Sequence, residues 1–527
     1  EMSASLVGSE MCIRDRACLV IRFSIQYNKI EDKEVELMKL FKRALISFAA
    51  LIMLIGTAAG CSEQTGGPSA TPAPTLSNST DSAQTSPGAE EGIFKAGEEY
   101  RYFAWAISEE DPFPNNTELY KRQKAEMKEK LESTYGITIK YIGPESESTW
   151  TTEVGASAYA GKPMTDILDF GASWTQVGIF NYQSTAGGLF VPIGAYDNVA
   201  DFTDEQYWDQ ISQQSCVYNG QLYFAVPYNA SVGNYQVTFF NRQVLADAGY
   251  NDDTLYQLQA DGKWNWDKFR EIASAATDLD KGIYGTAFGQ TIENFVYAND
   301  AAFFEKVDYD GTIIEQFAGN KRNAVEAWEF LLNMAGEGWV NTELYQGDNY
   351  LSAAFFRGEL AMMCTWAARA ADQDTKGLDY GILYIPKGPQ AEDYSSAVIE
   401  YNPFGIYKGH ANPEGCVKLL NQFVRPYYAK DSEEIKAEIA VEISAIALDE
   451  GSINTLETVA DYAVPANYRL YQRVPVGEDG SSNCATVIWY SGRREFFDGG
   501  KSPQQYFDSV AEMVNQALLE HVYSMKK

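Results

Sequence analysis

Residues 117–143 read "TELYKRQKAEMKEKLESTYGITIKYIG" and decide the fold class. Charged side chains recur at helical spacing from Thr117, a good N-cap, to Gly136, a good helix end, so 117–136 is a predicted helix. Alternating patterns at 100–107 and at 137–143 predict a strand on each side of it. A strand, a helix and a strand in succession favour an α/β fold with a parallel sheet.

Elements of the same kinds recur further along the chain. Residues 237–250 read as a strand followed by a helix, and 355–372 as a short strand that leads to a turn. The other predicted elements are strands at 165–171, 219–228 and 379–389 and helices at 264–278 and 502–524. The helix at 264–278 is amphipathic, with an apolar side formed by Trp266, Phe269, Ile272 and Ala273. The last helix begins with Ser502 as N-cap, Pro503 at the first helical position and Gln505 in a capping box.

Length and composition set outer bounds on function. A chain of 527 residues suggests two or more domains. With 73 acidic and 41 basic residues the net charge is −32, which disfavours nucleic acid and anionic lipid surfaces as partners. The 34 Tyr and 10 Trp combine an apolar face with a polar tip, which suits a sugar-like ligand, although most aromatic residues fill the core.

Cysteine and histidine are too few and too scattered to indicate a metal or catalytic centre. None of the seven Cys forms a C-x-x-C pair, and His410 and His521 are the only histidines. We therefore expect no metal and no cofactor. The sequence leaves open whether a disulfide forms among Cys216, Cys364, Cys416 and Cys484.

Residues 306–315, "KVDYDGTIIE", match a calcium loop only in part. With Gly311 as the loop glycine, Asp308 and Asp310 stand correctly, but the first ligand position is Lys306 and the last is Phe317. The tripeptide "YDG" therefore predicts a hairpin turn.

Residues 38–60, "MKLFKRALISFAALIMLIGTAAG", have the anatomy of an export signal, with a basic start, an apolar centre and small residues at the end. The apolar centre is short for a membrane span. The ending "AAGC" resembles the bacterial lipobox, although Ala58 stands where that motif usually has Leu, and it implies that Cys61 is lipidated. Residues 61–93 are rich in Ser, Thr, Pro and Gly, and we expect a disordered tether.

Residues 1–37 precede the signal and show no comparable sequence pattern. The stretch "LVGSEMCIRDR" at 6–16 resembles a translated adapter from sequencing-library preparation. The tripeptide "KEV" at 33–35 can be encoded by a ribosome-binding sequence, at a suitable distance before Met38. We expect residues 1–37 to be a non-native adapter and leader; a genuine N-terminal extension is the alternative.

Several ordered stretches beyond residue 100 resemble the extracellular solute-binding proteins of ABC transporters, in the family-1 sugar-binding group that includes maltose-binding protein. They are "AGKPMTDIL" at 160–168, "GGLFVPIGAY" at 187–196, "YNGQLYFAVPY" at 218–228, "FFNRQVLADAGY" at 239–250, "WNWDKF" at 264–269, "GIYGTAF" at 282–288, "FRGELAMM" at 356–363 and "DYGILYIPKGP" at 379–389. Each stretch is weak alone, and their order and spacing carry the resemblance.

The resemblance implies a two-lobed periplasmic-binding-protein-like α/β fold (type II) with a ligand cleft between the lobes. The first lobe is expected at 94–228, with about 386–435 returning to it, and the second at 229–385 with about 436–527. The implied function is capture of a carbohydrate by hinge closure and delivery to permease subunits in the membrane. We expect a monomer on the extracellular face of a Gram-positive type membrane, held there by the lipid anchor alone.

Candidate ligand residues come from loops at the carboxyl ends of predicted strands and from positions that the resemblance implies. They are Trp105, Asp169, Phe170, Ser173, Trp174, Tyr228, Asn229, Trp366, Tyr401, Asn402, Trp489 and Arg493. Trp264, Trp266 and Trp328 belong to predicted helices and are expected to be structural.

Two other functions stay open. A secreted carbohydrate-active hydrolase would also be acidic and aromatic-rich, and with 73 acids some suitable carboxylate pair can always be found. A binding protein for another polar solute, such as a peptide, is the second. The signal, the tether and the ordered stretches favour a binding protein that is not an enzyme.

Overall fold

The computed structural model describes most of the chain beyond residue 91. The described residues are 92–103, 113, 118–143, 156–157, 160–169, 188–218, 220–289, 293–342, 348–372, 377–398, 402–466, 471, 474–477, 482–497 and 500–523. The chain divides into two units, Glu1–Gln84 and Thr85–Lys527, and every described residue belongs to the second. The predictions for the signal, for Cys61 and for most of the tether lie outside the described residues.

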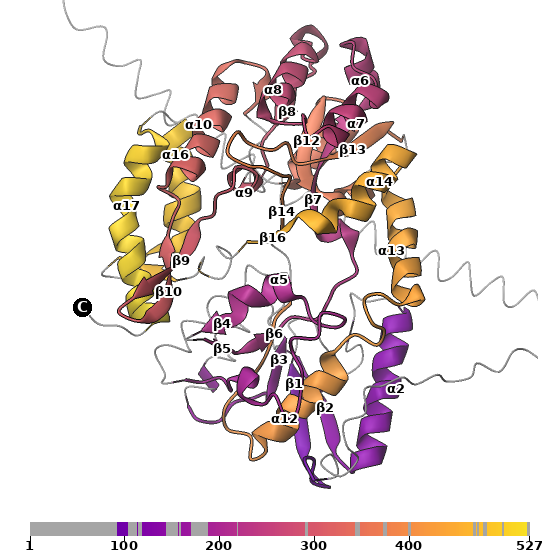
Figure 1. Cartoon of the computed structure of the whole chain (residues 1–527), viewed down its shortest axis with the longest axis vertical. Helices are drawn as coiled ribbons and strands as arrows, with labels where there is room; N and C mark the ends of the chain where they lie inside the picture. Colours follow the sequence, from indigo (N-terminus) through magenta and orange to yellow (C-terminus); the bar gives the residue numbers. More distant parts are fainter. Residues whose placement is uncertain are drawn as a thin grey trace, which may run out of the picture. The chain divides into compact units, whose positions relative to one another are not determined.

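A five-stranded sheet with the order β2-β1-β3-β15-β6 organises the first part of the fold (Figure 1). Its strands are β1 (Glu99–Phe103), β2 (Thr138–Ile142), β3 (Ile167–Asp169), β15 (Phe404–Ile406) and β6 (Phe224–Ala225). Helix α2 (Glu118–Tyr135) joins β1 to β2, and β1 pairs in parallel with both β2 and β3, which confirms the predicted unit. Strand β15 returns from far along the chain and lies antiparallel between β3 and β6.

Both faces of this sheet are buried, because successive side chains of β1, β3 and β6 enter different hydrophobic clusters. Tyr102, Ile167 and Ala225 belong to the smaller cluster, which also contains apolar residues of α12 (Pro413–Leu419). Their chain neighbours Phe103, Leu168 and Phe224 belong to the larger cluster. The sheet is therefore fixed in register by apolar packing on two sides.

An ion pair between Arg101 and Asp166 fastens β1 to the start of β3. The Arg101 Nη2 and Nε atoms donate to the two carboxylate oxygens of Asp166 at 2.7 and 3.0 Å, and the Arg101 N–H donates to the same carboxylate at 2.8 Å. The Asp166 side chain is 1% exposed, and its bonds raise the pKa of Arg101. A buried carboxylate with a bidentate partner is stable only while that partner stays in place.

Lys124 of α2 is a buried cation without a carboxylate partner in the described part of the chain. Its Nζ donates to the carbonyl of Phe423 and, at 3.3 Å, to that of Val424, the last residues of a π-helical turn (Leu420–Val424). Lysine near a helix C-terminus satisfies carbonyls that have no partner within the helix. Burial lowers the pKa of Lys124 to about 7.

A second sheet has three strands in the order β12-β7-β13, which are β12 (Met362–Trp366), β7 (Gln236–Asn241) and β13 (Tyr380–Tyr384). Both outer strands run antiparallel to β7, unlike the parallel strands around β1. Strand β13 ends earlier than the predicted 379–389, because Pro386 has no N–H to continue the ladder.

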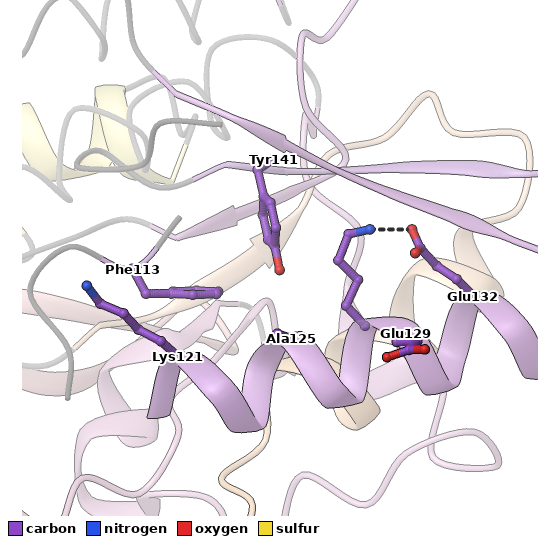
Figure 2. A pocket seen from close by; sticks show the side chains of 7 residues that line it. Phe113, Lys121, Ala125, Glu129, Glu132 and Tyr141 are labelled. Carbon is purple, nitrogen blue, oxygen red and sulfur yellow. Dashed lines mark hydrogen bonds and ion pairs between the residues drawn. The ribbon is translucent and has the colours of Figure 1, made fainter. Parts of the chain in front are cut away.

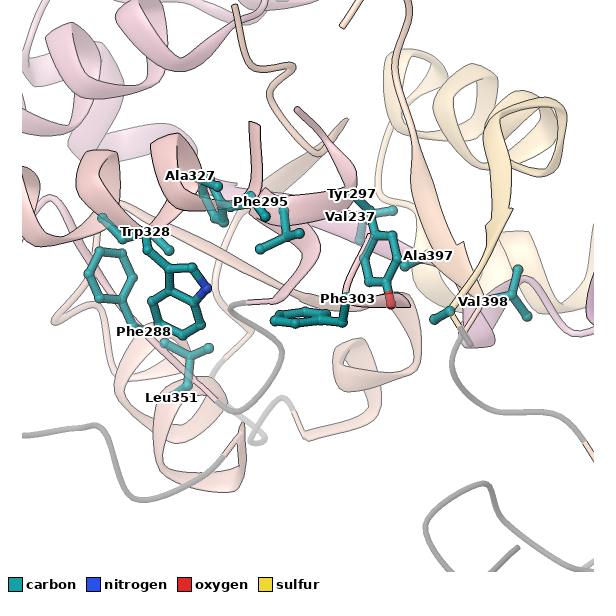
Figure 3. Packing of buried hydrophobic residues seen from close by; sticks show 14 of the residues in the cluster. Val237, Phe288, Phe295, Tyr297, Phe303, Ala327, Trp328, Leu351, Ala397 and Val398 are labelled. Carbon is teal, nitrogen blue, oxygen red and sulfur yellow. The ribbon is translucent and has the colours of Figure 1, made fainter. Parts of the chain in front are cut away.

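Helices surround the second sheet on a large apolar cluster. They include α6 (Arg242–Asp247), α7 (Asp252–Ala260), α8 (Trp266–Ala275), α9 (Asn294–Tyr297), α10 (Arg322–Gly336), α11 (Asp348–Phe356), α13 (Glu433–Ile446), α14 (Glu450–Thr458), α16 (Gly492–Phe497) and α17 (Pro503–Ala517). The predicted apolar side of α8 is buried, and so are Trp264 and Trp328. In Figure 3, Tyr297 of α9 and Phe303 lie beside Ala397 and Val398 of β14 (Ser396–Val398), which pairs with β16 (Ala463–Pro465).

The predicted hairpin turn is confirmed. Strands β9 (Phe304–Tyr309) and β10 (Thr312–Phe317) pair around Asp310 and Gly311, whose φ values are 50° and 81°. Two consecutive positive φ values are the signature of the tight turn that matches strand twist. The Asp308 carboxylate accepts the Gly311 N–H at 2.7 Å and closes the turn.

Short pairs complete the sheets: β4 (Val217–Tyr218) with β5 (Gln221–Leu222), β8 (Thr286–Ala287) with β11 (Val340–Asn341), and β17 (Pro475–Val476) with β18 (Ser482–Asn483). The predicted capping box opens α17, with Ser502 and Gln505 each bonded to the other's backbone N–H. Cys216, Cys364, Cys416 and Cys484 are all free thiols. Among the described helices, none is long and apolar enough to cross a membrane.

We predict that Asp166→Asn destabilises the fold by about 1.5–3 kcal/mol, because it removes the charge-assisted bonds to Arg101, whose partly exposed guanidinium can still reach water. Chemical denaturation measures the loss. The control is Lys140→Met, which removes an exposed ion pair between β2 and β1 (Lys140 to Glu99, 2.6 Å) and should cost less than about 1 kcal/mol. Equal losses in the two variants would contradict this account.

We also predict a pH-dependent contribution from Lys124. Its folded pKa of about 7 lies below the ordinary value of 10.5, so the unfolded chain binds more protons between these values and stability rises with pH there. The free energy of unfolding of the wild type, relative to Lys124→Met, should increase by about 2–3 kcal/mol from pH 7.5 to 9.5. A difference that is constant over this range would mean that Lys124 stays charged in the fold.

Candidate functional site

The structure describes five of the twelve candidate ligand residues with their side chains: Asp169, Tyr228, Asn229, Trp366 and Asn402. Trp105, Phe170, Ser173, Trp174 and Tyr401 lie outside the described residues. Trp489 and Arg493 stand in a π-helical turn (Ala485–Ser491) and in α16, and their side chains are outside the described part.

Asp169 and Asn402 lie at one edge of the five-stranded sheet. Asp169 is the last residue of β3 and stands opposite Phe404, the first residue of β15. Asn402 precedes Phe404 by two residues and is exposed, while Asp169 is half-buried. The antiparallel pairing thus brings the carboxyl end of β3 and the start of β15 together, so that two of the candidate residues lie near each other in the fold.

Trp366 lies at an edge of the second sheet. It is the last residue of β12, is half-buried, and stands opposite Gln236, the first residue of β7. Residues 228–235, which we name the first crossing segment, enter β7 at this position after leaving β6. The carboxyl end of β12 therefore faces the point at which the chain arrives from the five-stranded sheet.

Tyr228 and Asn229 begin the first crossing segment and are engaged locally. The Tyr228 N–H donates to the Tyr207 carbonyl at 2.8 Å, and the Lys430 Nζ lies 5.2 Å from the centre of the Tyr228 ring. The side-chain oxygen of Asn229 accepts the Ser231 N–H at 2.9 Å. One face of the Tyr228 ring is thus covered by a cation, and Asn229 shapes a turn.

Tyr235, at the end of the same segment, is an additional candidate that the sequence pattern does not indicate. It is half-buried, and its carbonyl accepts the Ala367 N–H at 3.0 Å, which places it beside the residue that follows Trp366. Burial raises the pKa of its phenol, and the carboxylates of Asp209 and Asp461 raise it further. Asp209 caps α5 (Gln210–Gln213) close to the five-stranded sheet, whereas Asp461 stands in a turn (Val459–Tyr462) after α14.

Tyr235 lies at the junction of the two sheets, where burial and the charges of Asp209 and Asp461 raise the pKa of its phenol. In sequence, "YQVTFF" at 235–240 reads simply as the start of a strand. Nothing local distinguishes Tyr235 from the core aromatics. Only the crossing of the chain between two sheets, with α5 and β16 in contact, brings Asp209 and Asp461 toward one phenol.

A cavity of about 670 Å³ opens near this junction. Gln214, which follows α5, lines it together with Tyr297 of α9, Lys306 of β9 and Val464 of β16. The Lys306 Nζ donates to the Gln214 carbonyl at 3.4 Å. The volume of this cavity lies within the usual range for small-molecule sites, which is about 300–1,000 Å³.

Charged side chains of both signs surround the remainder of this cavity. The basic members are Lys306, Lys321 and Arg322, and the acidic members are Asp300, Glu305 and Glu315. One pair is direct, with Lys321 Nζ 3.2 Å from a carboxylate oxygen of Glu305. A wall of this kind offers many hydrogen-bond donors and acceptors with a balanced formal charge.

A smaller cavity of about 200 Å³ lies against α2 (Figure 2). The rings of Phe113 and Tyr141 form one wall, 5.6 Å apart between centres and edge to face. On α2, Lys128 pairs with Glu132 at 2.7 Å, and Glu132 also accepts the Ile139 N–H at 2.8 Å. This volume is below the usual range for ligand sites, and two of its charged residues, Lys128 and Glu132, already bond within the helix and to β2.

Metal chemistry finds no support in the described ranges, where no group of three or more His, Cys, Asp or Glu side chains is placed to hold an ion. The described thiols are not activated either, because burial raises the pKa of Cys216, Cys364, Cys416 and Cys484.

Solved structures similar to this fold are two-lobed binding proteins. The cyclic alpha-maltosyl-1,6-maltose binding protein of Arthrobacter globiformis matches with a TM-score of 0.55 and 10% identity, over 80% of this chain and 99% of that chain. A cyclo/maltodextrin-binding protein complexed with maltotetraose matches with a TM-score of 0.51 and 15% identity, over 82% and 99% of the two chains. At such identities the likeness establishes the two-lobed α/β fold alone.

Comparison of sequences identifies the family. No curated protein is significantly similar to the chain. The model of the family described as bacterial extracellular solute-binding protein matches residues 126–433, which is more than half of the chain. The chain therefore belongs to the bacterial extracellular solute-binding proteins.

Proposed function

We propose that this protein is the substrate-binding component of an ABC importer, that it captures a carbohydrate by hinge closure, and that it delivers it to membrane permease subunits. The observation that carries the proposal is the junction of the two sheets, where Trp366 pairs with Gln236 and the Ala367 N–H donates to the Tyr235 carbonyl, in a chain of the solute-binding family. Binding without turnover is part of the proposal.

A carbohydrate suits this junction for physical reasons. A sugar ring has apolar C–H faces, which stack on aromatic rings, and a rim of hydroxyl groups, which need hydrogen-bond partners. Trp366 and Tyr235 are half-buried aromatics, and burial together with the charges of Asp209 and Asp461 raises the pKa of the Tyr235 phenol, so that it stays a hydroxyl that can donate to a ligand. The solved neighbours named above are maltodextrin- and cyclic maltosyl-maltose-binding proteins, which makes glucose oligosaccharides the first ligands to test.

The lobes are proposed with boundaries close to those expected from sequence. The first lobe holds the five-stranded sheet, and the second lobe holds the sheet around β7. The proposed return to the first lobe falls between β14 and β15, because Ser396 of β14 accepts the Gln236 N–H at 2.9 Å whereas Phe404 of β15 pairs with Asp169. Export by residues 38–60 and a lipid anchor at Cys61 complete the proposal and place the protein, as a monomer, outside the cytoplasmic membrane.

The ligand proposal predicts that maltotetraose or a cyclic glucose oligosaccharide raises the melting temperature and changes tryptophan fluorescence. Trp366→Ala should weaken this binding by about 2 kcal/mol, or roughly 30-fold, because it removes a stacking platform. The matched control is Tyr350→Ala, which removes an exposed aromatic of α11 and should bind as the wild type does. Stabilisation by peptides alone, or release of free sugar in the same mixtures, would contradict the proposal.

A second prediction separates the two tyrosines of the first crossing segment. Tyr235→Phe should weaken carbohydrate binding by about 1 kcal/mol, or roughly fivefold, because a hydroxyl that can bond the ligand is lost. Tyr228→Phe is the comparison, since Lys430 covers one face of the Tyr228 ring, and we propose that this hydroxyl contributes less to binding than that of Tyr235. Isothermal titration calorimetry measures both, and a loss confined to Tyr228→Phe would reverse the assignment.

A further inference from the structure

The first crossing segment is held to helix α13 by one carboxylate. Glu442 of α13 accepts the Ser231 hydroxyl at 2.7 Å and the Gly233 N–H at 3.2 Å on one oxygen, and the Val232 N–H at 2.7 Å on the other. Glu442 is half-buried, and no Lys or Arg among the described residues forms an ion pair with it. All three of these donors to Glu442 therefore come from a single turn, residues 231–233.

The same turn is packed tightly against the residues after Trp366. A Cβ atom on Gly233 would lie 3.0 Å from the Ala368 Cβ and 3.0 Å from a Glu442 carboxylate oxygen. The Ala367 N–H donates to the Tyr235 carbonyl and so attaches the end of the segment to the residues after Trp366 as well. Residues 231–235 thus belong mechanically to the second lobe.

The start of the segment belongs to the first lobe. Tyr228 N–H donates to the Tyr207 carbonyl at 2.8 Å, and Pro227 pairs with Trp208 in an isolated bridge. Trp208 is buried in the smaller hydrophobic cluster. Only Asn229 and Ala230 lie between this attachment and the first residue held by Glu442.

A later part of the chain repeats the arrangement. The Lys430 N–H donates to the Gln206 carbonyl at 2.8 Å. The Gln206 side chain donates to the Asp431 carboxylate at 2.7 Å and accepts the Asp431 N–H at 3.2 Å. Ser432 then caps α13. Gln206 and Tyr207 therefore bond both the first crossing segment and residues 430–431 to the first lobe. Beyond these bonds, the first crossing segment is bonded to α13 through Glu442, and the later part continues directly into α13 at Ser432.

We propose that Glu442 is a positioning residue that fixes the first crossing segment to α13 and confines the hinge to Asn229 and Ala230, with a second hinge point at residues 431–432. Helix α13 then moves as one body with the second lobe. The consequence for ligand capture rests on the proposed hinge closure, whereas the attachment itself is measurable without any ligand.

Hydrogen exchange of the full-length protein tests the attachment directly. In Glu442→Ala the amides of Val232 and Gly233 should exchange at least about tenfold faster, since they lose a charged acceptor, while those of β7 keep their protection. The matched control is Glu438→Ala, which removes an exposed carboxylate from the same helix and should change neither. Unchanged exchange at 232–233 in Glu442→Ala would overturn the proposal.

A second variant is needed if Glu442→Ala also speeds up amide exchange in β7. Glu442→Gln keeps the volume and one acceptor oxygen, so faster exchange should be confined to residues 232–233 and be smaller than in the alanine variant. Wild-type exchange at both amides in Glu442→Gln, together with general loosening in Glu442→Ala, would show a purely structural role and overturn the proposal.

Distances between spin labels at Glu129→Cys of α2 and Asp280→Cys, both exposed, test the hinge in the ligand-free protein. Glu442→Ala should broaden the distribution of distances relative to the wild type, and Glu438→Ala should leave it unchanged. A wild-type distribution in Glu442→Ala would overturn the hinge assignment. Because no carbohydrate is present, this result is independent of whether the ligand proposal holds.

Discussion

The backbone N–H groups of the first crossing segment impose the constraint on which the junction of the lobes depends. A chain that leaves one sheet for another loses its ladder partners, and each buried N–H must find an acceptor elsewhere. Tyr228 uses a carbonyl of the first lobe, Ser231 uses the Asn229 side chain, and Tyr235 uses the Val232 carbonyl. The N–H groups of Val232 and Gly233 donate to Glu442, so one carboxylate accepts two backbone hydrogen bonds for which neither sheet offers a partner.

Local chemistry made several elements predictable from sequence. Asp310 and Gly311 tolerate positive φ and give the hairpin, and Ser502 with Gln505 opens α17 because both partners of a capping box lie within one turn. The α/β unit around α2 follows in the same way from periodicity in neighbouring stretches. In each case the residues that decide the structure are close together in the chain.

The junction was not predictable in this way, because its partners are far apart in sequence. Glu442 reads as one of several acidic residues on a helix, and nothing near Val232 indicates an acceptor more than 200 residues away. The same is true of Tyr235, whose carbonyl is bonded by Ala367, a residue far along the chain. The antiparallel pairing of β7 with β12 and β13 likewise depends on non-local register, which periodicity within one strand does not report.

Stacking and hinge motion are joined through a few backbone contacts. Trp366 is followed by Ala367, whose N–H donates to the Tyr235 carbonyl. The next residue, Ala368, packs so closely against Gly233 that a side chain at position 233 would not fit. In our proposal, residues 231–235 move as one body with α13, so a ligand that stacks on Trp366 would contact this moving body. Protein interiors are close-packed and deform little, so such a ligand would not distort the site. It would instead shift the population among the hinge angles that the protein already samples. Contact with the first lobe at Asp169 or Asp209 would then favour the closed angles, and this is how a small solute can set the relative position of two large lobes.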